Sequence, residues 1–277
     1  MEIVERRIEV RDYLTKSNLP ASDYVINPYV GCPHACKYCY ARFMKRFTGH
    51  KEKWGSFIDI KDCSKPINRK KLEGKSVFIA SVTDCYNEFE KKYEITRKIL
   101  EQLKSADCEV TISTKSNLVL RDMDLLKEIS NLKVAFSVNT LDEKFRNDMD
   151  SGSTIAERLE AMKLLHDVGI YTVLFISPIF PFITDWKKII EETKDFTDEY
   201  WFENLNLRGE YKQEILDYID SNYPQFADGY QKIYVQKDSA YWENLSHILK
   251  EYCKAQNVNN KIYFFHKKLV QQKLEKR

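Results

Sequence analysis

Three cysteines close together near the amino terminus are the residues of this chain best suited to metal chemistry. Cys32, Cys36 and Cys39 form a C-x3-C-x2-C pattern within residues 31–40. Thiolate is a soft ligand that favours iron–sulfur clusters, zinc or Cu(I). Four-iron clusters with four cysteines and structural zinc sites with four ligands are closed. A cluster held by only three cysteines therefore keeps one iron open for a small molecule.

A zinc site is the alternative interpretation of the same cysteines. His34 could supply a fourth ligand and complete a Cys3His zinc knuckle, but it lies between two cysteines with little chain to turn inward. The total of seven cysteines is odd and the amino terminus does not resemble a signal peptide, so we expect no structural disulfide. The other cysteines are widely separated and offer no second zinc pair: Cys63, Cys85, Cys108 and Cys253.

The cysteine spacing, with Tyr38 directly before the last cysteine, resembles the signature of the radical S-adenosylmethionine (SAM) superfamily. The resemblance implies a 4Fe-4S cluster on the three cysteines, with an open iron that binds the amino and carboxylate groups of SAM. It also implies that one electron from the reduced cluster cleaves SAM to methionine and a 5′-deoxyadenosyl radical. We count Tyr38 among the cofactor-binding candidates.

Size and composition narrow the class of protein. The chain has 277 residues, of which 43% are hydrophobic, enough for one large domain or one domain with an extension. It has no run of about eighteen apolar residues and a charged amino terminus, so we expect a cytoplasmic protein without a membrane span. A net charge of +2 gives no global field for nucleic acid. A local basic group, either a solvated helix face or a lip that meets phosphates, follows the cysteines: Arg42, Lys45, Arg46, Lys51 and Lys53.

Short apolar runs alternate with longer amphipathic segments along most of the chain. The runs rich in Val, Ile, Phe and Tyr predict strands at 24–29, 76–81, 109–114, 133–138, 171–177 and 200–205. Helical patterns cover 90–104 and 155–168, the second with Gly169 as its carboxyl-terminal cap. The expected amino-terminal helix caps are Asp122, Asp142 and Thr184.

Strands that alternate with helices predict a parallel sheet with right-handed crossovers. We therefore expect an α/β fold, a partial (β/α)6 TIM-type barrel over residues 1–208. Residues 209–277 would form a C-terminal cap with a late strand at 262–265. Functional groups should lie at the carboxyl ends of the barrel strands, and the cysteines follow the first of these strands.

Polar residues end the second, third and fourth predicted strands, where SAM would bind. The Asp84 carboxylate suits an ammonium group, Lys115 suits a carboxylate, and Asn139 suits a ribose diol. Such residues commonly end strands, so each is a weak signal alone. The full set of candidates is Ser81, Thr83, Asp84, Lys115, Ser137, Asn139 and, on the following helix, Arg158.

Six short motifs together resemble the spore photoproduct lyase-like branch of the superfamily over about residues 24–190. The resemblance implies a partial TIM barrel with SAM contacts at the strand ends, although a glycine-containing motif of many radical SAM enzymes is not evident at 173–177. The motifs are Asn27-Pro28-Tyr29-Val30-Gly31-Cys32, Trp54-Gly55, Thr83-Asp84 with Tyr86, Thr114-Lys115-Ser116, Arg121-Asp122, and Pro178-Ile179-Phe180-Pro181 with Thr184-Asp185.

Three residues are candidates for a direct part in the reaction. The lyase splits a thymine dimer in DNA and is thought to use a cysteine near the second strand as hydrogen donor, which makes Cys85 a candidate, although it could equally be a small semi-buried residue. Glu203 and Arg208, around the sixth strand, could position a polar substrate opposite the cluster or form a strand-end salt bridge.

The sequence thus predicts a radical SAM enzyme that abstracts hydrogen from an unidentified substrate. An external one-electron donor would reduce the cluster, and the substrate could be nucleic acid or be presented by a protein partner. Two alternatives stay open: a zinc-stabilised binding module without radical chemistry, and a DNA photoproduct lyase proper.

Overall fold

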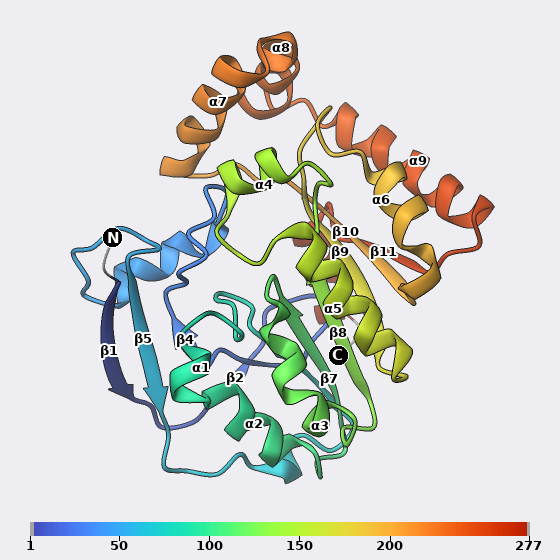
Figure 1. Cartoon of the computed structure of the whole chain (residues 1–277). Coiled ribbons are helices and arrows are strands. Elements are labelled where there is room, and N and C mark those ends of the chain that lie inside the picture. Colours follow the sequence, from blue (N-terminus) through green and yellow to red (C-terminus); the bar gives the residue numbers. More distant parts are fainter. Residues whose placement is uncertain (1–2, 276–277) are drawn as a thin grey trace.

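A curved sheet of eight strands forms the centre of the computed structural model, which describes residues 3–275 apart from the side chains of residues 266, 267 and 274 (Figure 1). Every neighbouring pair is parallel except β2 and β3. In order across the sheet, the strands are β11 Asn260–Ile262, β10 Glu199–Asn204, β9 Tyr171–Ile179, β8 Leu132–Ser137, β7 Cys108–Thr114, β6 Lys75–Ile79, β3 Tyr24–Ile26 and β2 Leu14–Lys16.

Alternation of side chains along the strands builds the main core. In β7, Val110 and Ile112 are fully buried against the helices, while Thr111 lies on the other face of the sheet. The helices of this core are α1 Glu90–Tyr93, α2 Ile95–Leu103, α3 Met123–Leu126, α5 Ile155–Asp167, α6 Trp186–Thr193 and α9 Ala240–Ala255. Each of the six predicted strands overlaps a strand of this sheet, and the predicted partial (β/α)6 TIM-type barrel is confirmed.

The first predicted strand, 24–29, is wrong in extent, because it is divided between two sheets. Pro28 lacks a backbone N–H and biases the preceding residue away from helix, so the chain turns there and β4 Tyr29–Val30 joins a second sheet. That sheet has the order β1-β5-β4, with β1 Val4–Glu9 parallel and β4 antiparallel to β5 Phe57–Asp62. The turn at Pro28 directs the chain into the cysteine segment.

Two predicted element boundaries are also wrong. The helix expected over 90–104 is split into α1 and α2 at Glu94, which has φ of +51°. The buried Glu90 carboxylate accepts the amides of Thr96 and Arg97 and so begins the second helix separately. The late strand is β11, Asn260–Ile262, rather than 262–265, and the Tyr263 amide after it still donates to the Phe202 carbonyl of β10.

Of the predicted caps, Asp142 and Gly169 are confirmed. Asp142 accepts two amides at the start of α4 Glu143–Met149, and Gly169 follows α5 with φ of +83°. Thr184 is not a cap: Asp185 caps α6, while the Thr184 hydroxyl donates to the Asn139 carbonyl. Asp122 precedes α3 but makes no cap bond.

The chain after Gly209 covers the cysteine segment and then returns to the sheet as β11. Ile215, Leu216 and Ile219 of α7 Glu210–Asn222 pack in one cluster with Cys36 and Tyr38. The further helices here are α8 Ala227–Tyr230 and α10 His266–Glu275, and α7 and α8 lie at the top of Figure 1. None of the helices described within residues 3–275 has the length and apolar character needed to cross a membrane.

Five 3-10 helices and one π-helix connect several of these elements in the described part of the chain. They are the 3-10 helices Tyr40–Phe47, Arg69–Lys71, Asn117–Asp122, Lys194–Phe196 and Pro224–Phe226, and the π-helix Gln231–Val235.

The Arg121-Asp122 motif belongs to a buried ionic group that fastens the early helices together. Glu90 and Asp122 have no exposed surface, and the Arg121 guanidinium donates to both carboxylates at 2.7 Å. Arg97 and the Tyr29 hydroxyl complete the group. Each buried charge of this group has partners within the protein, so the Arg121-Asp122 motif has a structural role.

We expect Arg121→Met to lower the free energy of unfolding by about 3–5 kcal/mol, because it removes the cation that the two buried carboxylates share. Urea denaturation followed by circular dichroism measures the change. Arg97→Met is the control and should cost less, because Asp122 keeps Arg121 and the other partner of Arg97, Asp124, is exposed. Equal losses in the two variants would contradict this assignment.

Candidate active site

The three cysteines lie on one tight loop, residues 31–40, between β4 and the 3-10 helix that follows. Gly31 has φ of +86°, and a Cβ there would lie 2.4 Å from the Phe57 carbonyl oxygen, so only glycine fits. Ala35 also has positive φ, and its amide donates to the Cys32 carbonyl at 3.2 Å. The backbone of the loop is therefore set before any ligand binds.

The three thiols are withdrawn from water. Cys32 and Cys36 are each 9% exposed and Cys39 is half-buried. Burial raises the pKa of all three thiols, that of Cys32 to about 12. A thiol of this kind stays protonated at neutral pH until a metal displaces its proton.

The residues around the sulfurs suit a cluster better than a single zinc ion. The His34 ring is paired with a carboxylate, because its Nδ1 lies 3.4 Å from Asp84 Oδ2. Within residues 3–275, no three His, Cys, Asp or Glu side chains converge closely enough to hold one metal ion. A cluster makes no such demand, because each cysteine ligates a different iron. The donor set, three thiols on one loop, therefore fits a cluster with three protein ligands.

Backbone hydrogen bonds join the cysteine loop to a segment more than one hundred residues later. The Lys37 amide donates to the Met149 carbonyl at 2.9 Å, and the Ser151 amide donates to the His34 carbonyl at 2.8 Å. The hydroxyl of Thr83, one of the predicted site residues, donates to the Gly31 carbonyl at 2.7 Å. The loop is thus held from two sides by the carboxyl end of the barrel.

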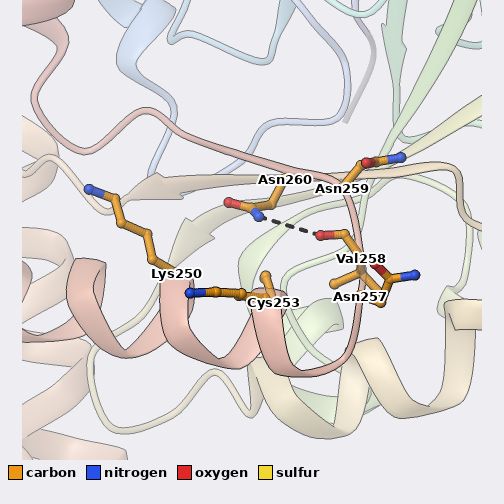
Figure 2. Close-up of a pocket in the computed structure, with 7 residues that line it drawn as sticks. Lys250, Cys253, Asn257, Val258, Asn259 and Asn260 are labelled. Atoms are coloured by element: carbon orange, nitrogen blue, oxygen red, sulfur yellow. Dashed lines mark hydrogen bonds between the residues drawn. The ribbon is translucent and has the colours of Figure 1, made fainter.

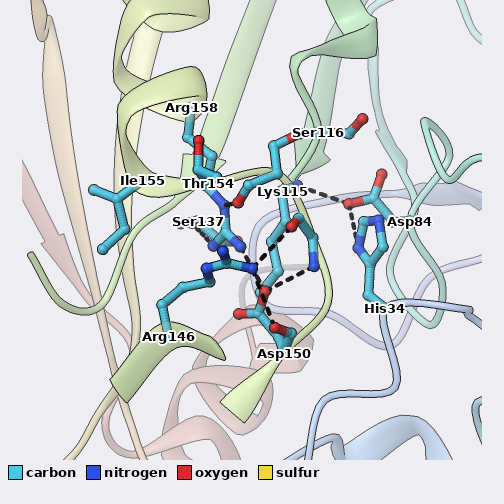
Figure 3. A network of polar contacts seen from close by, with 12 residues as sticks. His34, Asp84, Lys115, Ser116, Ser137, Arg146, Asp150, Thr154, Ile155 and Arg158 are labelled. Carbon is cyan, nitrogen blue, oxygen red and sulfur yellow. Dashed lines mark hydrogen bonds and ion pairs between the residues drawn. The ribbon is translucent and has the colours of Figure 1, made fainter. Parts of the chain in front are cut away.

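Asp84 fastens two strand ends to each other. Its carboxylate accepts the Tyr86 amide at 2.9 Å, the Thr114 hydroxyl at 2.8 Å and the Lys115 amide at 2.7 Å, and His34 lies beside it (Figure 3). Burial lowers the pKa of His34, with Asp84 opposing this, so the ring is neutral at pH 7. Asp84 is part of the site, but the protein itself already occupies its carboxylate.

Asp150 is a site residue that the sequence interpretation missed. Its buried carboxylate accepts the Tyr38 hydroxyl at 3.1 Å, the Gly152 amide at 3.0 Å and the Arg158 guanidinium (Figure 3). Burial alone would raise the pKa of Asp150, but the charges of Arg158 and Lys115 outweigh it, so the pKa is lowered. The available signal was a run of small polar residues before a capping-box helix start at Thr154.

Arg158 lies where the sequence placed it, but its guanidinium is fully engaged by the protein. The residue is 1% exposed and donates to the carbonyls of Ser137 at 3.0 Å and Ser153 at 2.8 Å, besides Asp150. Gly152 makes room for it, because a Cβ there would lie 2.8 Å from the guanidinium. Arg158 therefore supports the site from beneath.

Lys115 is the cation best placed to receive a ligand. Its backbone is clamped, because its amide bonds to Asp84 and its carbonyl accepts the Ser153 amide at 3.0 Å. Its ammonium lies 5.9 Å from the Tyr38 ring centroid, and its charge acts on the thiols of Cys36 and Cys39. Among the described side chains, no carboxylate lies within ion-pair distance of this ammonium.

The other predicted SAM contacts lie at the carboxyl ends of their strands. Ser81, after β6, exchanges hydrogen bonds with Asn27. Ser137 ends β8, and Asn139 just beyond it is buried and donates its amide to the Pro178 carbonyl at 3.2 Å. Of these residues, Ser137 contacts the Asp150 network, because its carbonyl accepts the Arg158 guanidinium.

The predicted catalytic residues occupy three different environments. Cys85 has no exposed surface and belongs to the main hydrophobic core. Glu203 is the last residue but one of β10 and accepts the Ser177 hydroxyl at 2.6 Å. Arg208 lies on the surface and donates to Asn206 at 2.9 Å. Of the three, Glu203 is the one held at a strand end of the barrel.

A surface hollow elsewhere in the molecule is unrelated to this site. Figure 2 shows it between the end of α9 and the start of β11, where Lys250, Cys253 and Asn260 contribute to its lining. Because β11 is parallel to β10, its start lies at the amino ends of the strands, opposite the cysteine loop. Barrel enzymes place their chemistry at the carboxyl ends.

We expect Asp150→Asn to lower the free energy of unfolding by about 3–5 kcal/mol at pH 7, because it leaves Arg158 buried without its anion. The folded pKa of Asp150 lies below its unfolded value of about 4. The ion pair therefore stabilises the protein above that pH, and its contribution is lost as the pH falls through the lowered pKa. Urea denaturation at several pH values measures the free energy of unfolding. The difference in this free energy between the variant and wild type should become smaller below about pH 4.

The control for this comparison is Asp167→Asn, which changes an exposed carboxylate at the end of the same helix, α5. It should alter stability by less than about 0.5 kcal/mol. A difference for Asp150→Asn that is small, or that does not depend on pH in the acid range, would contradict the ion-pair assignment.

Comparisons with known proteins agree with this geometry. A family model described as the radical SAM superfamily matches residues 26–195. An uncharacterized protein of Methanocaldococcus jannaschii is 40% identical over 221 residues, which are 79% of this chain and 83% of that protein. An uncharacterized protein of Acidianus two-tailed virus is 31% identical over 219 residues, which are 72% of this chain and 71% of that protein.

Solved structures show the same fold. A spore photoproduct lyase variant with bound AdoMet and dinucleoside spore photoproduct has a TM-score of 0.60 and 18% identity, covering 80% of this chain and 66% of that chain. Streptococcus suis SuiB bound to S-adenosylmethionine has a TM-score of 0.54 and 19% identity, covering 86% of this chain and 49% of that chain. This chain thus spans about two thirds of the length of the first and half of the second. With its three-cysteine loop and partial barrel, it belongs to the radical SAM superfamily of enzymes.

Proposed function

We propose that Cys32, Cys36 and Cys39 ligate three irons of a 4Fe-4S cluster, and that SAM occupies the fourth iron through its amino and carboxylate groups. The observation that carries this proposal is the set of three withdrawn thiols on one rigid loop beside the unpaired Lys115 ammonium. When bound and reduced by an external one-electron donor, this pair supplies a 5′-deoxyadenosyl radical that abstracts hydrogen from the substrate.

The chain itself holds the cluster, shields it from water and oxygen, and orients the bound ligands. The loop backbone, fixed at Gly31 and Ala35, sets the spacing of the thiolates. Apolar side chains of α7, among them Leu216, pack against Cys36 and Tyr38. This packing supports the exclusion of water and oxygen, which a reactive radical requires.

We assign the SAM carboxylate to Lys115, because a partly buried ammonium without an anion suits a carboxylate. Asp84 is better suited to positioning Lys115 than to contacting SAM, because three protein donors already occupy its carboxylate. Arg158 likewise acts through Asp150 and the Ser137 carbonyl. The side-chain oxygens of Ser137 and Asn139 remain our candidates for the ribose.

We place the substrate, as part of this proposal, between the strand ends and the surface beside the cysteine loop. Glu203, held by Ser177, is our candidate for positioning it. A nucleic-acid substrate is favoured by one feature of that surface: the Arg46 guanidinium lies 4.7 Å from the ring centroid of Phe47, which is 67% exposed. Exposed aromatic rings beside cations are the surface that single-stranded nucleic acid uses. Arg42 of the predicted lip is instead paired with Glu214.

Photoproduct lyase activity proper has no comparable support. Cys85 would have to give a hydrogen atom to a substrate at the barrel mouth, yet its thiol is sealed in the core. In this proposal Cys85 is therefore a core residue. The substrate donates the hydrogen atom and the radical derived from the cofactor accepts it.

We expect anaerobic reconstitution with iron and sulfide to give a brown protein that forms 5′-deoxyadenosine from SAM and dithionite. Cys36→Ala should lose this product, because it removes a ligand of the cluster. Cys253→Ala changes a buried cysteine of α9 remote from the loop and should keep both colour and product. Colourless protein with stoichiometric zinc and no SAM cleavage would overturn the proposal in favour of a zinc-stabilised binding module.

We expect Lys115→Met to weaken SAM binding about 10- to 100-fold while iron content stays unchanged, because a charge-assisted contact is worth about 1.5–3 kcal/mol. Equilibrium dialysis of SAM against reconstituted protein measures the affinity. The matched control is Lys144→Met, which removes an exposed lysine of α4. Unchanged affinity in Lys115→Met with iron retained would refute the carboxylate assignment.

A further inference from the structure

Four helical segments form a unit that stands outside the barrel, and we call this unit, residues 210–235, the lid. Its parts are α7, the 3-10 helix Pro224–Phe226, α8 and the π-helix Gln231–Val235 (Figure 1). They pack on one another, and the Tyr223 ring stacks on that of Phe226 with centroids 6.2 Å apart. The Lys212 ammonium of α7 donates to the Tyr234 carbonyl of the π-helix at 2.8 Å. Within the described residues, no backbone–backbone hydrogen bond joins the lid to the barrel, so the lid can move as one unit.

Both connections of the lid to the rest of the chain are exposed and contain left-handed backbone. Gly209, before α7, has φ of +53°, and Lys237, after the π-helix, has φ of +61°, which is uncommon for a residue other than glycine. Residues 236–239 are all exposed. Near the first connection, the Tyr234 hydroxyl donates to the Leu205 carbonyl at 3.0 Å and holds the base of the lid. Hinges consist of a few residues at the ends of elements that absorb changes of φ and ψ, and these two connections have that character.

The lid contacts the cysteine loop through apolar side chains. Ile215, Leu216 and Ile219 of α7 are buried in the cluster that contains Cys36 and Tyr38. Side chains of the barrel complete this cluster: Phe145, Met149 and Phe180. The apolar face of α7 therefore keeps the lid closed over one of the three cysteines.

Two polar contacts join the rim of the lid to the barrel. Both carboxylate oxygens of Glu214 lie 2.9 Å from Arg42 Nη1, in the 3-10 helix that follows the cysteines. The Tyr218 hydroxyl donates to Asp148 Oδ2 at 2.8 Å, and the Lys37 ammonium lies 5.2 Å from the Tyr218 ring centroid. The Glu214 side chain is 50% exposed, and exposed ion pairs contribute little to stability. These contacts can therefore break and form again while the barrel stays folded.

We propose that the lid opens about Gly209 and Lys237 to admit the cluster and SAM to the cysteine loop, and closes over the loop when both are bound; this inference rests on the proposed function. In the closed position, Cys36 and Tyr38 are 9% and 8% exposed, so the lid limits access to this side of the loop. A ligand that binds the closed form more tightly shifts the lid toward closure. Closure of this kind excludes water from a reactive site.

The test is hydrogen–deuterium exchange, measured by mass spectrometry on the anaerobic full-length protein. It is recorded before reconstitution, after reconstitution with iron and sulfide, and after addition of SAM. The exchange rate of α7 is compared with that of α9, which lies outside the lid. Glu214→Gln and Tyr218→Phe each remove one polar contact of the rim. Glu251→Gln is the matched control, because it changes an exposed glutamate of α9.

We expect the amides of α7 in the unreconstituted protein to exchange about tenfold faster than those of α9, because the lid opens without unfolding of the barrel. Addition of SAM to the reconstituted protein should slow the exchange of α7 about tenfold and leave α9 unchanged, because the bound ligands favour the closed form. Before reconstitution, Glu214→Gln and Tyr218→Phe should each raise the exchange rate of α7 about two- to fivefold. Glu251→Gln should match wild type.

Three outcomes would overturn the inference. The first is equal exchange rates in α7 and α9 before reconstitution. The second is a protein that binds the cluster and cleaves SAM while the exchange of α7 stays unchanged, and the third is a wild-type rate of α7 in both rim variants. Wild-type protein that binds no cluster would instead overturn the proposed function itself, so the two failures are distinguishable.

Discussion

The buried ion pair between Asp150 and Arg158 is the interaction on which the arrangement of the site depends. Each side chain is 1% exposed, and each also forms hydrogen bonds with a different part of the barrel. Asp150 reaches the Tyr38 hydroxyl in the cysteine loop, and Arg158 reaches the Ser137 carbonyl at the end of β8. A loop near the amino terminus and a strand in the middle of the chain are therefore set by one pair of charges. Such a pair does not by itself make a protein more stable than apolar packing would; its consequence here is a defined geometry.

Lys115 lies near two carboxylates, those of Asp84 and Asp150, that are already bound by other groups of the protein. Asp84 holds the backbone of Lys115, and Asp150, neutralised by Arg158, lies near its ammonium without pairing to it. The cation is therefore fixed in position but not compensated. A ligand with a carboxylate gains from both conditions, because the lysine loses little freedom on binding and no internal partner must be displaced.

Local patterns were enough to find the cysteine loop, the parallel strands and most of the polar strand ends. The cysteines are close in sequence, and the alternation in runs such as Val110–Thr111–Ile112 follows from side-chain periodicity. What could not be read is the pairing between distant side chains. Tyr38 and Asp150 are 112 residues apart, and Asp84 and Lys115 are 31 apart. For the same reason, the contacts of Asp84 with Thr114 and Lys115 were not predicted. The small sheet of β1, β4 and β5 was also missed, because strand register across 53 residues leaves no local signal.

Lys115 links the charge of a bound ligand to the sulfurs of the loop. Its charge acts on the thiols of Cys36 and Cys39 from the carboxyl end of the barrel, where SAM binds in our proposal. A ligand carboxylate placed on Lys115 would weaken this effect, because the two opposite charges offset each other. The influence of Lys115 on the cluster would therefore change when SAM binds, whereas the hydrogen bond from the Ala35 amide to the Cys32 carbonyl, which fixes the loop backbone, would persist through the reaction.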